Sequence, residues 1–316
     1  MIWIERPQTD PWFNLAAEEF VLRHFTEDVL MFWQNTPSVV VGKHQNTLAE
    51  VNMDFVQANQ IPVIRRISGG GTVFHDLGNI NYTLIRSVEK DSMLVDFRKF
   101  TQPLRDFLET VGLEAYFEGK NNLRVQGKKF SGNAAHVFKQ RVMHHGTILF
   151  DTDLKVLEKV IQPSQEQYFD KGIKSINAEV TNISTLLLEK TSLKDFKKLM
   201  TDFFKDYFQI VDHQRLGADE VESIEKLAAS KYKTWEWNVG YSPKYTLQKE
   251  VDTAYGRLKT KLYVEAGIIQ DITLFIEEKK LIKIENQLKH QPHRKAVLLK
   301  LLATDRFSET LVNTLF

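Results

Sequence analysis

The chain has no cysteine in its 316 residues. That absence excludes disulfide bonds, thiolate metal sites and any mechanism that passes through a covalent thioester on the protein. The formal net charge is only +1, so charge gives no reason to expect binding to nucleic acid or to a membrane surface. No apolar run is long enough to span a bilayer, and the opening residues MIWIE do not form a signal peptide. We therefore expect a cytoplasmic protein with no nucleic-acid partner and no membrane partner.

The densest motif of the chain is residues 64–85, which read IRRISGGGTVFHDLGNINYTLI. An apolar run ends at Arg65 and Arg66, three glycines follow at positions 69 to 71, and residues 72–75 return to a strand-like pattern. Glycine tolerates positive φ and close approach of other groups, so we expect strand, turn and strand. Backbone N–H groups of such a turn, beside arginines, suit anionic oxygens, although a plain hairpin explains these residues equally well. No Gly-Lys-Ser/Thr follows, which excludes the phosphate loop of a nucleotidase.

A second dense segment, residues 119–149, contains two alternating stretches with glycines between them, which predict strands joined by turns. Lys129 comes just before residues 131–134, Ser-Gly-Asn-Ala, which we interpret as a turn able to wrap around a ligand. The other lysines and arginines of the segment are expected to form a solvated face. His144 and His145 are adjacent, so alternation directs them to opposite faces and at most one can face a site. We assign neither to catalysis.

The remaining patterns predict a mixture of helices and strands. Helices are expected from Pro11 onward after an Asp10 cap, and over 97–111, 151–162, 193–208, 218–229, 294–302 and 307–315. Strands are expected over 29–33, 38–41, 245–251, 257–266 and 268–275. After Ser242-Pro243 the residue pattern changes to long alternating strands, and we take this dipeptide as the domain boundary and a candidate hinge. The prediction is a mixed α+β fold, with a large domain of mixed sheets flanked by helices (1–243) and a small C-terminal α+β domain (244–316).

Residues 65–79 resemble the signature of the lipoate–protein ligase A family, which is close to R-R-x-S-G-G-G-x-V-F-H-D-x-G-N. Further blocks of the family pattern follow in its order, so the resemblance covers nearly the whole chain. These blocks are P-W-F-N-L-A-x-E-E from Pro11, G-x-x-Q-N from Gly42, K-[VF]-S-G-x-A from Lys129, H-H-G-T-[IL]-L from His144, K-G-I-x-S-[IV] from Lys171 and W-E-W-N-x-G from Trp235. One block departs, because the family's G-R-N-D reads Gly119-Lys120-Asn121-Asn122 here. The departure leaves any metal or ion-pair role at Asn122 open.

The resemblance implies an ATP-dependent ligase that activates lipoate to lipoyl-AMP, releases pyrophosphate, and then transfers the lipoyl group to an acceptor lysine. The implied acceptors are apo lipoyl domains of 2-oxoacid dehydrogenase E2 subunits and the glycine-cleavage H protein. Lys129 is implied as the catalytic residue, stabilising charge rather than acting as nucleophile. The implied ATP and adenylate contacts are Arg66, Gly71, Thr72, Val73, Phe74 and Lys129, and the implied lipoate contacts are Gly70, His75 and Lys129. Mg²⁺ is expected to be held mainly by phosphate oxygens, with no protein ligand identified and Asp76 only a weak candidate.

Two alternatives remain open at this point. The first is an octanoyl or lipoyl transferase of the same fold that needs no ATP; its cysteine-dependent forms are excluded, but transfer assisted by lysine alone is not. The second is a non-catalytic protein that binds lipoyl-adenylate or the acceptor domain, which only the change at Asn122 supports. The sequence does not distinguish lipoate from octanoate as the preferred acid, nor does it identify the acceptor or the oligomeric state.

Overall fold

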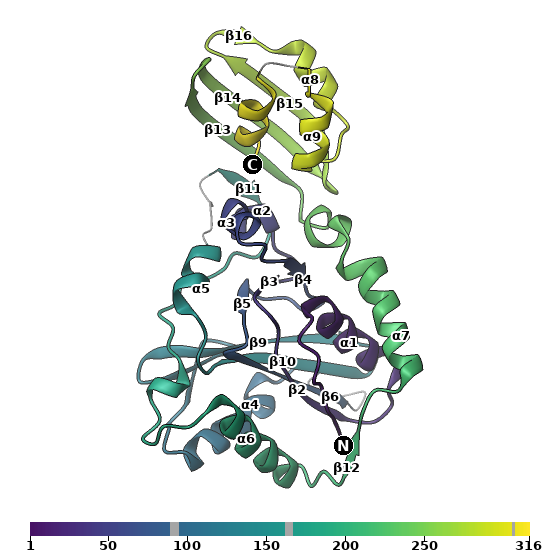
Figure 1. Cartoon of the computed structure of the whole chain (residues 1–316), viewed down its shortest axis with the longest axis vertical. Helices are drawn as coiled ribbons and strands as arrows, with labels where there is room; N and C mark the ends of the chain where they lie inside the picture. The colour runs from purple at the N-terminus through teal and green to yellow at the C-terminus, as the bar shows by residue number, and fades with distance from the viewer. Residues whose placement is uncertain (89–94, 162–166, 305–306) are drawn as a thin grey trace.

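The computed structural model describes residues 1–88, 95–161, 167–304 and 307–316. The chain forms a large module built on an eight-stranded and a three-stranded sheet, and a smaller C-terminal module built on a five-stranded sheet (Figure 1). This mixed α+β architecture confirms the predicted fold class. In the part of the chain that is described, no helix has the length and apolar character needed to cross a bilayer.

The eight-stranded sheet is the frame of the large module. In spatial order it consists of β12 (Asp212–Gln214), β1 (Ile2–Ile4), β2 (Val29–Trp33), β6 (Asn79–Ser87), β10 (Arg141–Leu149), β9 (Lys128–Phe138), β8 (Asn122–Val125) and β7 (Tyr116–Glu118). Strand β1 runs parallel to both of its neighbours, and the other pairs are antiparallel. Both faces of the sheet are covered, and its central strands β2, β6 and β10 are largely buried, with polar residues such as Asn81 and Thr147 among the apolar ones.

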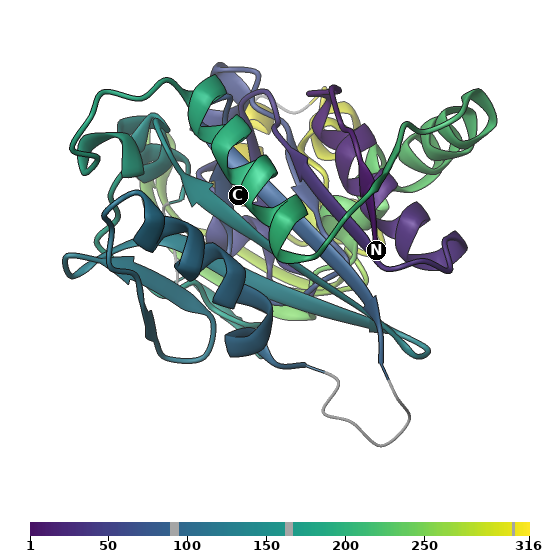
Figure 2. The same cartoon turned by 90° about the horizontal axis from the view of Figure 1, so that it is seen from below.

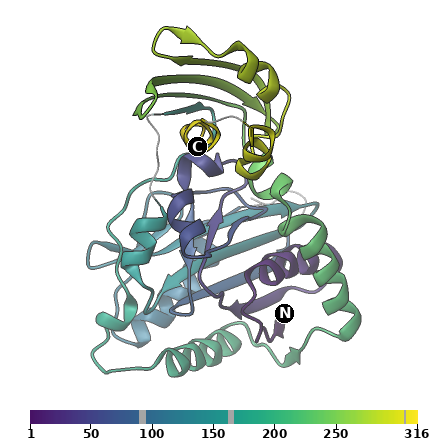
Figure 3. The ribbon, with the colours of Figure 1, turned by 45° about the horizontal axis from the view of Figure 1, so that its top comes forward.

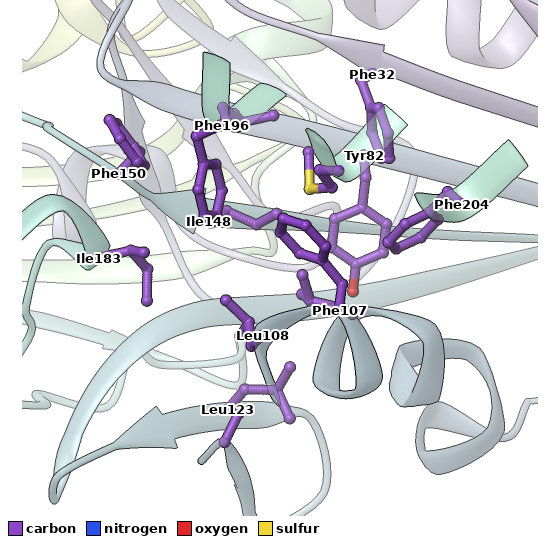
Figure 4. Close-up of a cluster of buried hydrophobic side chains, with 14 of the residues drawn as sticks. Phe32, Tyr82, Phe107, Leu108, Leu123, Ile148, Phe150, Ile183, Phe196 and Phe204 are labelled. Atoms are coloured by element: carbon purple, nitrogen blue, oxygen red, sulfur yellow. The ribbon is translucent and has the colours of Figure 1, made fainter. Parts of the chain in front are cut away.

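One face of this sheet packs on α4 (Phe97–Thr110) and α6 (Leu193–Tyr207), which lie across it in Figure 2. Asp96 and Ser192 cap the two helices by accepting hydrogen bonds from backbone N–H groups in the first turn. Phenylalanines at helical spacing then meet Phe32, Tyr82 and Ile148 of the sheet (Figure 4). The phenylalanine stripes therefore form core, as expected, and each fully buried ring contributes roughly 1.5–3 kcal/mol to folding.

The opposite face of the sheet packs on α1 (Pro11–His24), α7 (Ala218–Leu227) and the three-stranded sheet. That small sheet has the order β4 (Val63–Arg65), β3 (Ser38–Val41), β5 (Val73–His75), with β3 and β4 parallel. The bounds of β2 and β3 are those predicted. Helix α1 begins at Pro11 as predicted, because Asp10 accepts a hydrogen bond from the N–H of Phe13 at 2.7 Å.

Two predictions in this module need correction. Residues 131–134 form no turn, because they continue β9, where Gly132 pairs with Asn122 of β8 and Asn133 pairs with Gly146 of β10. The helix predicted over 151–162 is shorter: α5 spans Leu154–Val160 after an Asp153 cap, and residue 162 is outside the described residues.

The C-terminal module stacks a sheet on short helices (Figure 3). Its sheet has the order β11 (Tyr168–Asp170), β13 (Tyr245–Thr253), β14 (Gly256–Glu265), β15 (Ile268–Ile276), β16 (Lys279–Lys280). Its helices are α8 (Ile282–Leu288), which the sequence patterns did not predict, α9 (Lys295–Leu301) and α10 (Ser308–Thr314).

The two modules are connected by more than the linker at Ser242. Strand β11 comes from the large module's part of the sequence yet pairs with β13. Two short helices of the large module lie below this sheet, α2 (Thr47–Glu50) and α3 (Met53–Ala58), and α2 adds Leu48 and Ala49 to the C-terminal core. The segment that leads to Ser242 contains two short π-helices, Ala228–Tyr232 and Glu236–Gly240.

Candidate active site

A cavity of about 260 Å³ lies between the large sheet and the three-stranded sheet. One row of residues crosses four adjacent strands along its floor. Trp33 of β2 pairs with Asn81 of β6, Asn81 pairs with Thr147 of β10, and Thr147 Oγ1 accepts a hydrogen bond from the N–H of Gly132 of β9 at 3.3 Å. Three inter-strand steps amount to about 14 Å. The cavity is therefore elongated, with Gly132 and Trp33 at opposite ends of its floor.

The glycine turn forms one wall of the cavity, as predicted. Gly70 has φ of +88°, a conformation that strongly favours glycine. The turn also packs closely on the chain after β3, where a Cβ atom on Gly42 would lie 2.0 Å from the carbonyl oxygen of Gly70. The turn is thus held in one shape by its neighbours.

Arg66 holds the glycine turn from inside. Its Nη2 donates to the carbonyl oxygens of Gly69 and Gly71 at 2.6 and 2.7 Å, and its Nε donates to Ser68 Oγ at 3.0 Å. Burial lowers the pKa of Arg66 to about 10, so the guanidinium stays charged near neutral pH. Arg66 lines the cavity as predicted, but much of its donor capacity is used on the turn itself.

Lys129 lies where the first cavity meets a second one. Its backbone bridges to residues 179–181, because the Lys129 N–H donates to the carbonyl oxygen of Glu179 at 2.8 Å and its own carbonyl accepts from Thr181 at 2.9 Å. The side chain folds over Gly132, since a Cβ there would be 3.3 Å from Lys129 Nζ. Burial lowers its pKa, and Arg124 and Arg66 act in the same direction. The neighbouring Lys128, at the surface, is the one that pairs with Glu179, at 2.7 Å.

Residues 173–176 cover the first cavity and are tied to its other walls through Ser175. The Ser175 Oγ accepts hydrogen bonds from the N–H of Thr72 at 3.0 Å and from Gln45 Nε2 at 3.1 Å. The Ser175 N–H donates to the Glu50 carboxylate at 3.1 Å, and burial raises the pKa of Glu50. The motif block that begins at Lys171 therefore lies over the first cavity.

The second cavity adjoins the first and shares Thr72, Val73 and Lys129 with it. It extends over Phe74 and Leu149 toward α5 and is bounded by residues 175–180. The structure thus brings all the predicted site residues together around one continuous space. Those that line the first cavity are Arg66, Gly70, Gly71, Thr72, Val73, His75 and Lys129. Only Phe74 belongs to the second cavity alone.

Carboxylates are scarce around this space. Among the described residues the first cavity is lined by no aspartate or glutamate, and the second has only Glu158 and Glu179. Asn121 and Asn122 line the first cavity, and Asn122 stands where the family pattern has its aspartate. Asp76 instead fixes a turn, accepting hydrogen bonds from the N–H groups of Gly78 and Asp153.

Sequence reasoning missed a buried polar network behind the site. The Glu18 carboxylate accepts hydrogen bonds from Thr83 Oγ1 at 2.5 Å and from His145 Nδ1 at 3.0 Å. The His145 Nε2 is 2.6 Å from Ser68 Oγ, and His145 lines the cavity while His144 stacks on Phe100 on the other face. The prediction that only one of the two histidines can face the site is confirmed. The only available signal was that Glu18 and Ser68 both fall within matched motif blocks.

Arg65 was also left without a predicted role. Its side chain makes seven hydrogen bonds, all to carbonyl or hydroxyl oxygens of residues 42–47 and 237–242. One acceptor is Ser242 Oγ at 3.0 Å, so the residue proposed as a hinge is bonded directly to the strand that enters the glycine turn.

Comparison with known proteins agrees with this geometry. Residues 10–205 match the lipoyl protein ligase A/B catalytic domain, and residues 242–313 match the bacterial lipoate protein ligase C-terminus. Lipoate–protein ligase 1 of Staphylococcus aureus is 37% identical over 269 residues, which cover 84% of this chain and 81% of that protein. The lipoate-protein ligase LplJ of Bacillus subtilis is 35% identical over 310 residues, which cover 96% of this chain and 93% of that protein.

Solved structures that resemble this chain also include lipoate–protein ligases. A crystal structure of lipoate-protein ligase A bound with ATP is 25% identical, with a TM-score of 0.64 over 76% of this chain and 98% of that one. A bi-partite lipoate protein ligase from Thermoplasma acidophilum, studied with its E2 lipoyl domain, is 26% identical, with a TM-score of 0.65 over 79% of this chain and 98% of that one. The chain therefore belongs to the lipoate–protein ligase family of enzymes.

Proposed function

We propose that this enzyme joins lipoate to protein in two steps, first forming lipoyl-AMP from lipoate and ATP and then transferring the lipoyl group to an acceptor lysine. The observation that carries the proposal is the position of Lys129 at the junction of two cavities. The elongated first cavity suits the acyl chain, and the larger second cavity suits the adenosine. The acyl phosphate would then lie at Lys129 and at Thr72 and Val73, which directly follow the glycine turn and line both cavities.

In the first step an oxygen of the lipoate carboxylate attacks the α-phosphorus of ATP, and the bond to pyrophosphate breaks. The protein must offset crowded negative charge and align two reactants. The Lys129 ammonium and the backbone N–H groups of residues 71–74 supply donors, and the buried Arg66 adds a fixed positive charge behind them. Because Thr72 donates its N–H to Ser175, residues 173–176 must shift before a phosphate oxygen can take that donor.

In the second step a neutral acceptor lysine amine attacks the acyl carbonyl carbon, AMP leaves with the electron pair of the broken C–O bond, and the proton that the amine loses passes to water. Lys129 stabilises the oxyanion that develops on the carbonyl oxygen. Its lowered pKa does not make it the nucleophile, because a lysine beside the phosphate is held as a cation. His145 is hydrogen-bonded to Glu18 and Ser68, and we assign it no role as the base that takes a proton from the acceptor lysine.

Mg²⁺ is proposed to enter with ATP. With so few carboxylates around the cavities, phosphate oxygens and water would hold the ion, and Asn121 or Asn122 could add an amide oxygen. The Mg²⁺ would neutralise charge on the phosphates when bound.

We further propose that the acceptors are apo lipoyl domains of 2-oxoacid dehydrogenase E2 subunits and the glycine-cleavage H protein. The archaeal relative studied with its E2 lipoyl domain supports the first of these.

We divide the chain into a catalytic domain, 1–243, and an accessory domain, 244–316. We also propose a cytoplasmic location, which suits an enzyme that uses ATP.

The test is lipoate-dependent exchange of labelled pyrophosphate into ATP. Lys129→Met keeps the length of the side chain but removes its charge, and we expect a loss of exchange of about 10²- to 10³-fold. Lys128→Met, which removes the adjacent surface lysine, is the matched control and should retain activity. Absence of exchange in the unaltered enzyme, or equal activity of the two variants, would refute the proposal. An assay with octanoyl carrier protein in ATP-free buffer tests the transferase alternative.

A further inference from the structure

A chain of buried hydrogen bonds leads from Arg6 to the far end of the acyl cavity. Arg6 Nη2 donates to Asn14 Oδ1 at 2.5 Å, and Asn14 Nδ2 is 2.9 Å from Asn35 Oδ1. Asn35 Nδ2 is 3.1 Å from His75 Nδ1, and His75 lines the cavity. All four side chains are at most 4% exposed. None of these residues except His75 belongs to the reaction described above.

In this series of hydrogen bonds, the donor and the acceptor of each bond are fixed. A guanidinium can only donate, so the atom of Asn14 that it contacts is the amide oxygen. The amide nitrogen of Asn14, which also donates to the carbonyl oxygens of Gln8 and Gln34, must then face the oxygen of Asn35. Asn35 is left with its nitrogen toward His75, so His75 Nδ1 accepts. A neutral imidazole that accepts at Nδ1 carries its proton on Nε2.

His75 is neutral because burial lowers its pKa to about 3, with Arg66 and His145 acting in the same direction. Its Nε2 is buried and has no hydrogen-bond partner among the described residues. The ring lies edge-on to Trp33, with centroids 5.9 Å apart, so it is at the β2 end of the cavity, opposite Lys129. A buried donor without a partner is costly, and a ligand that supplies an acceptor at this point regains that free energy.

We propose that His75 is a specificity-determining residue, whose Nε2–H donates to a sulfur atom at the distal end of the acyl chain and so favours lipoate over an acid that ends in hydrocarbon, such as octanoate. Arg6, Asn14 and Asn35 are positioning residues that set the proton on Nε2. Disulfide sulfur is a weak acceptor, so the effect is moderate rather than absolute. The inference rests on the proposed function and adds to it the choice of acid.

The first test compares lipoate with octanoate by kcat/KM in the pyrophosphate exchange assay. His75→Phe retains an aromatic ring but lacks the donor, and we expect the preference for lipoate to fall about tenfold. His144→Phe, on the other face of the sheet, is the control and should keep the preference. If neither acid supports exchange in the unaltered enzyme, the proposed function fails. If both do but His75→Phe leaves their ratio unchanged, only this inference fails.

The second test reverses the direction of the hydrogen bond between residue 35 and His75. In the Asn35→Asp variant the new carboxylate accepts at both oxygens, so His75 would carry its proton on Nδ1 and lose the donor at Nε2. The lipoate preference of Asn35→Asp should be lost at alkaline pH and return on acidification, when the imidazole becomes protonated at both nitrogens. The lipoate preference of the unaltered enzyme should not depend on pH. Arg66 stays charged, and any change at His145 or Lys129 would alter the activity with lipoate and with octanoate equally. A purely structural role of Asn35 predicts no such reversal.

The proton itself can be observed directly in the unaltered protein. A long-range ¹H–¹⁵N spectrum of histidine-labelled enzyme distinguishes protonated from bare ring nitrogens, and His75→Phe assigns the signal. We expect the proton of His75 on Nε2 in the unaltered protein. A proton on Nδ1 would overturn the inference, whether or not Asn35→Asp folds.

Discussion

The hydroxyl oxygen of Ser175 accepts a hydrogen bond from the backbone N–H of Thr72, 103 positions earlier in the chain, at 3.0 Å. This bond joins residues 173–176 to the glycine turn over the cavity, and it occupies a donor that we propose for a phosphate oxygen. On that proposal the bond must break before ATP binds fully.

We predict that Ser175→Ala binds ATP more tightly than the unaltered enzyme, by roughly two- to tenfold, because a net hydrogen bond of about 1 kcal/mol no longer competes with the nucleotide. Titration calorimetry with Mg²⁺ and ATP measures the change. Ser184→Ala, which removes a hydroxyl bonded to Asp151 away from both cavities, is the control. Weaker binding in Ser175→Ala would instead mean that the hydroxyl contacts the nucleotide.

Arg65 is expected to stabilise the fold rather than bind the substrate. The guanidinium of Arg65 makes its seven hydrogen bonds with five N–H donors, and Arg65→Lys leaves only three donors, so several of the buried acceptors lose this partner. We predict a loss of about 3 kcal/mol or more in the free energy of unfolding, measured by urea denaturation. Arg141→Lys, which alters an arginine bonded near the surface, should cost less than about 1 kcal/mol. Equal costs would contradict this role.

Ser68, His145 and Glu18 have the contacts of a hydrolytic triad, which raises the alternative of an acyl-enzyme transferase. Ser68 is fully buried, however, and its oxygen accepts a hydrogen bond from Arg66 Nε at 3.0 Å. We predict that Ser68→Ala keeps pyrophosphate exchange within about tenfold and loses about 1–2 kcal/mol of stability, because His145 Nε2 loses its partner. A mass spectrum that finds an acyl group on Ser68 of the unaltered enzyme would reverse this conclusion.

The sequence predicted those elements whose signals are local. Strands β2 and β3 match because each is a short apolar run bounded by turn residues, and α1 matches because Asp10-Pro11 marks its beginning. The turn predicted at residues 131–134 was wrong, because pairing on both sides of β9 keeps Gly132 extended despite its weak strand propensity.

The site was predictable in its membership but not in its contacts. The motif blocks named the residues around the cavity, yet they did not show that Arg66 holds backbone carbonyls or that hydrogen bonds connect Arg6 to His75 through Asn14 and Asn35. Such roles depend on which donor meets which acceptor, and the partners lie between 3 positions apart, as for Arg66 and Gly69, and 40 positions apart, as for Asn35 and His75. Periodicity and spacing carry no information about those partners.

Acid stability offers a test of the buried face opposite the site. The ring of His144 stacks on Phe100 with centroids 3.6 Å apart, and burial lowers its pKa from 6.5 to about 3. In the unfolded chain His144 takes up a proton near pH 6.5, whereas in the folded protein it stays neutral down to about pH 3. Stability is therefore lost as the pH falls from 6.5 toward 3, since the unfolded state binds more protons in that window.

The expected size of this effect between pH 7 and pH 5 is about 2 kcal/mol for His144. We predict that the free energy of unfolding falls by about that much less in His144→Phe than in the unaltered enzyme over the same interval. Other buried histidines, such as His293, are present in both proteins and cancel in the comparison. Parallel losses in the two proteins would show that the folded protein protonates His144 as readily as the unfolded chain does, so that its stacking against Phe100 leaves the ring open to water.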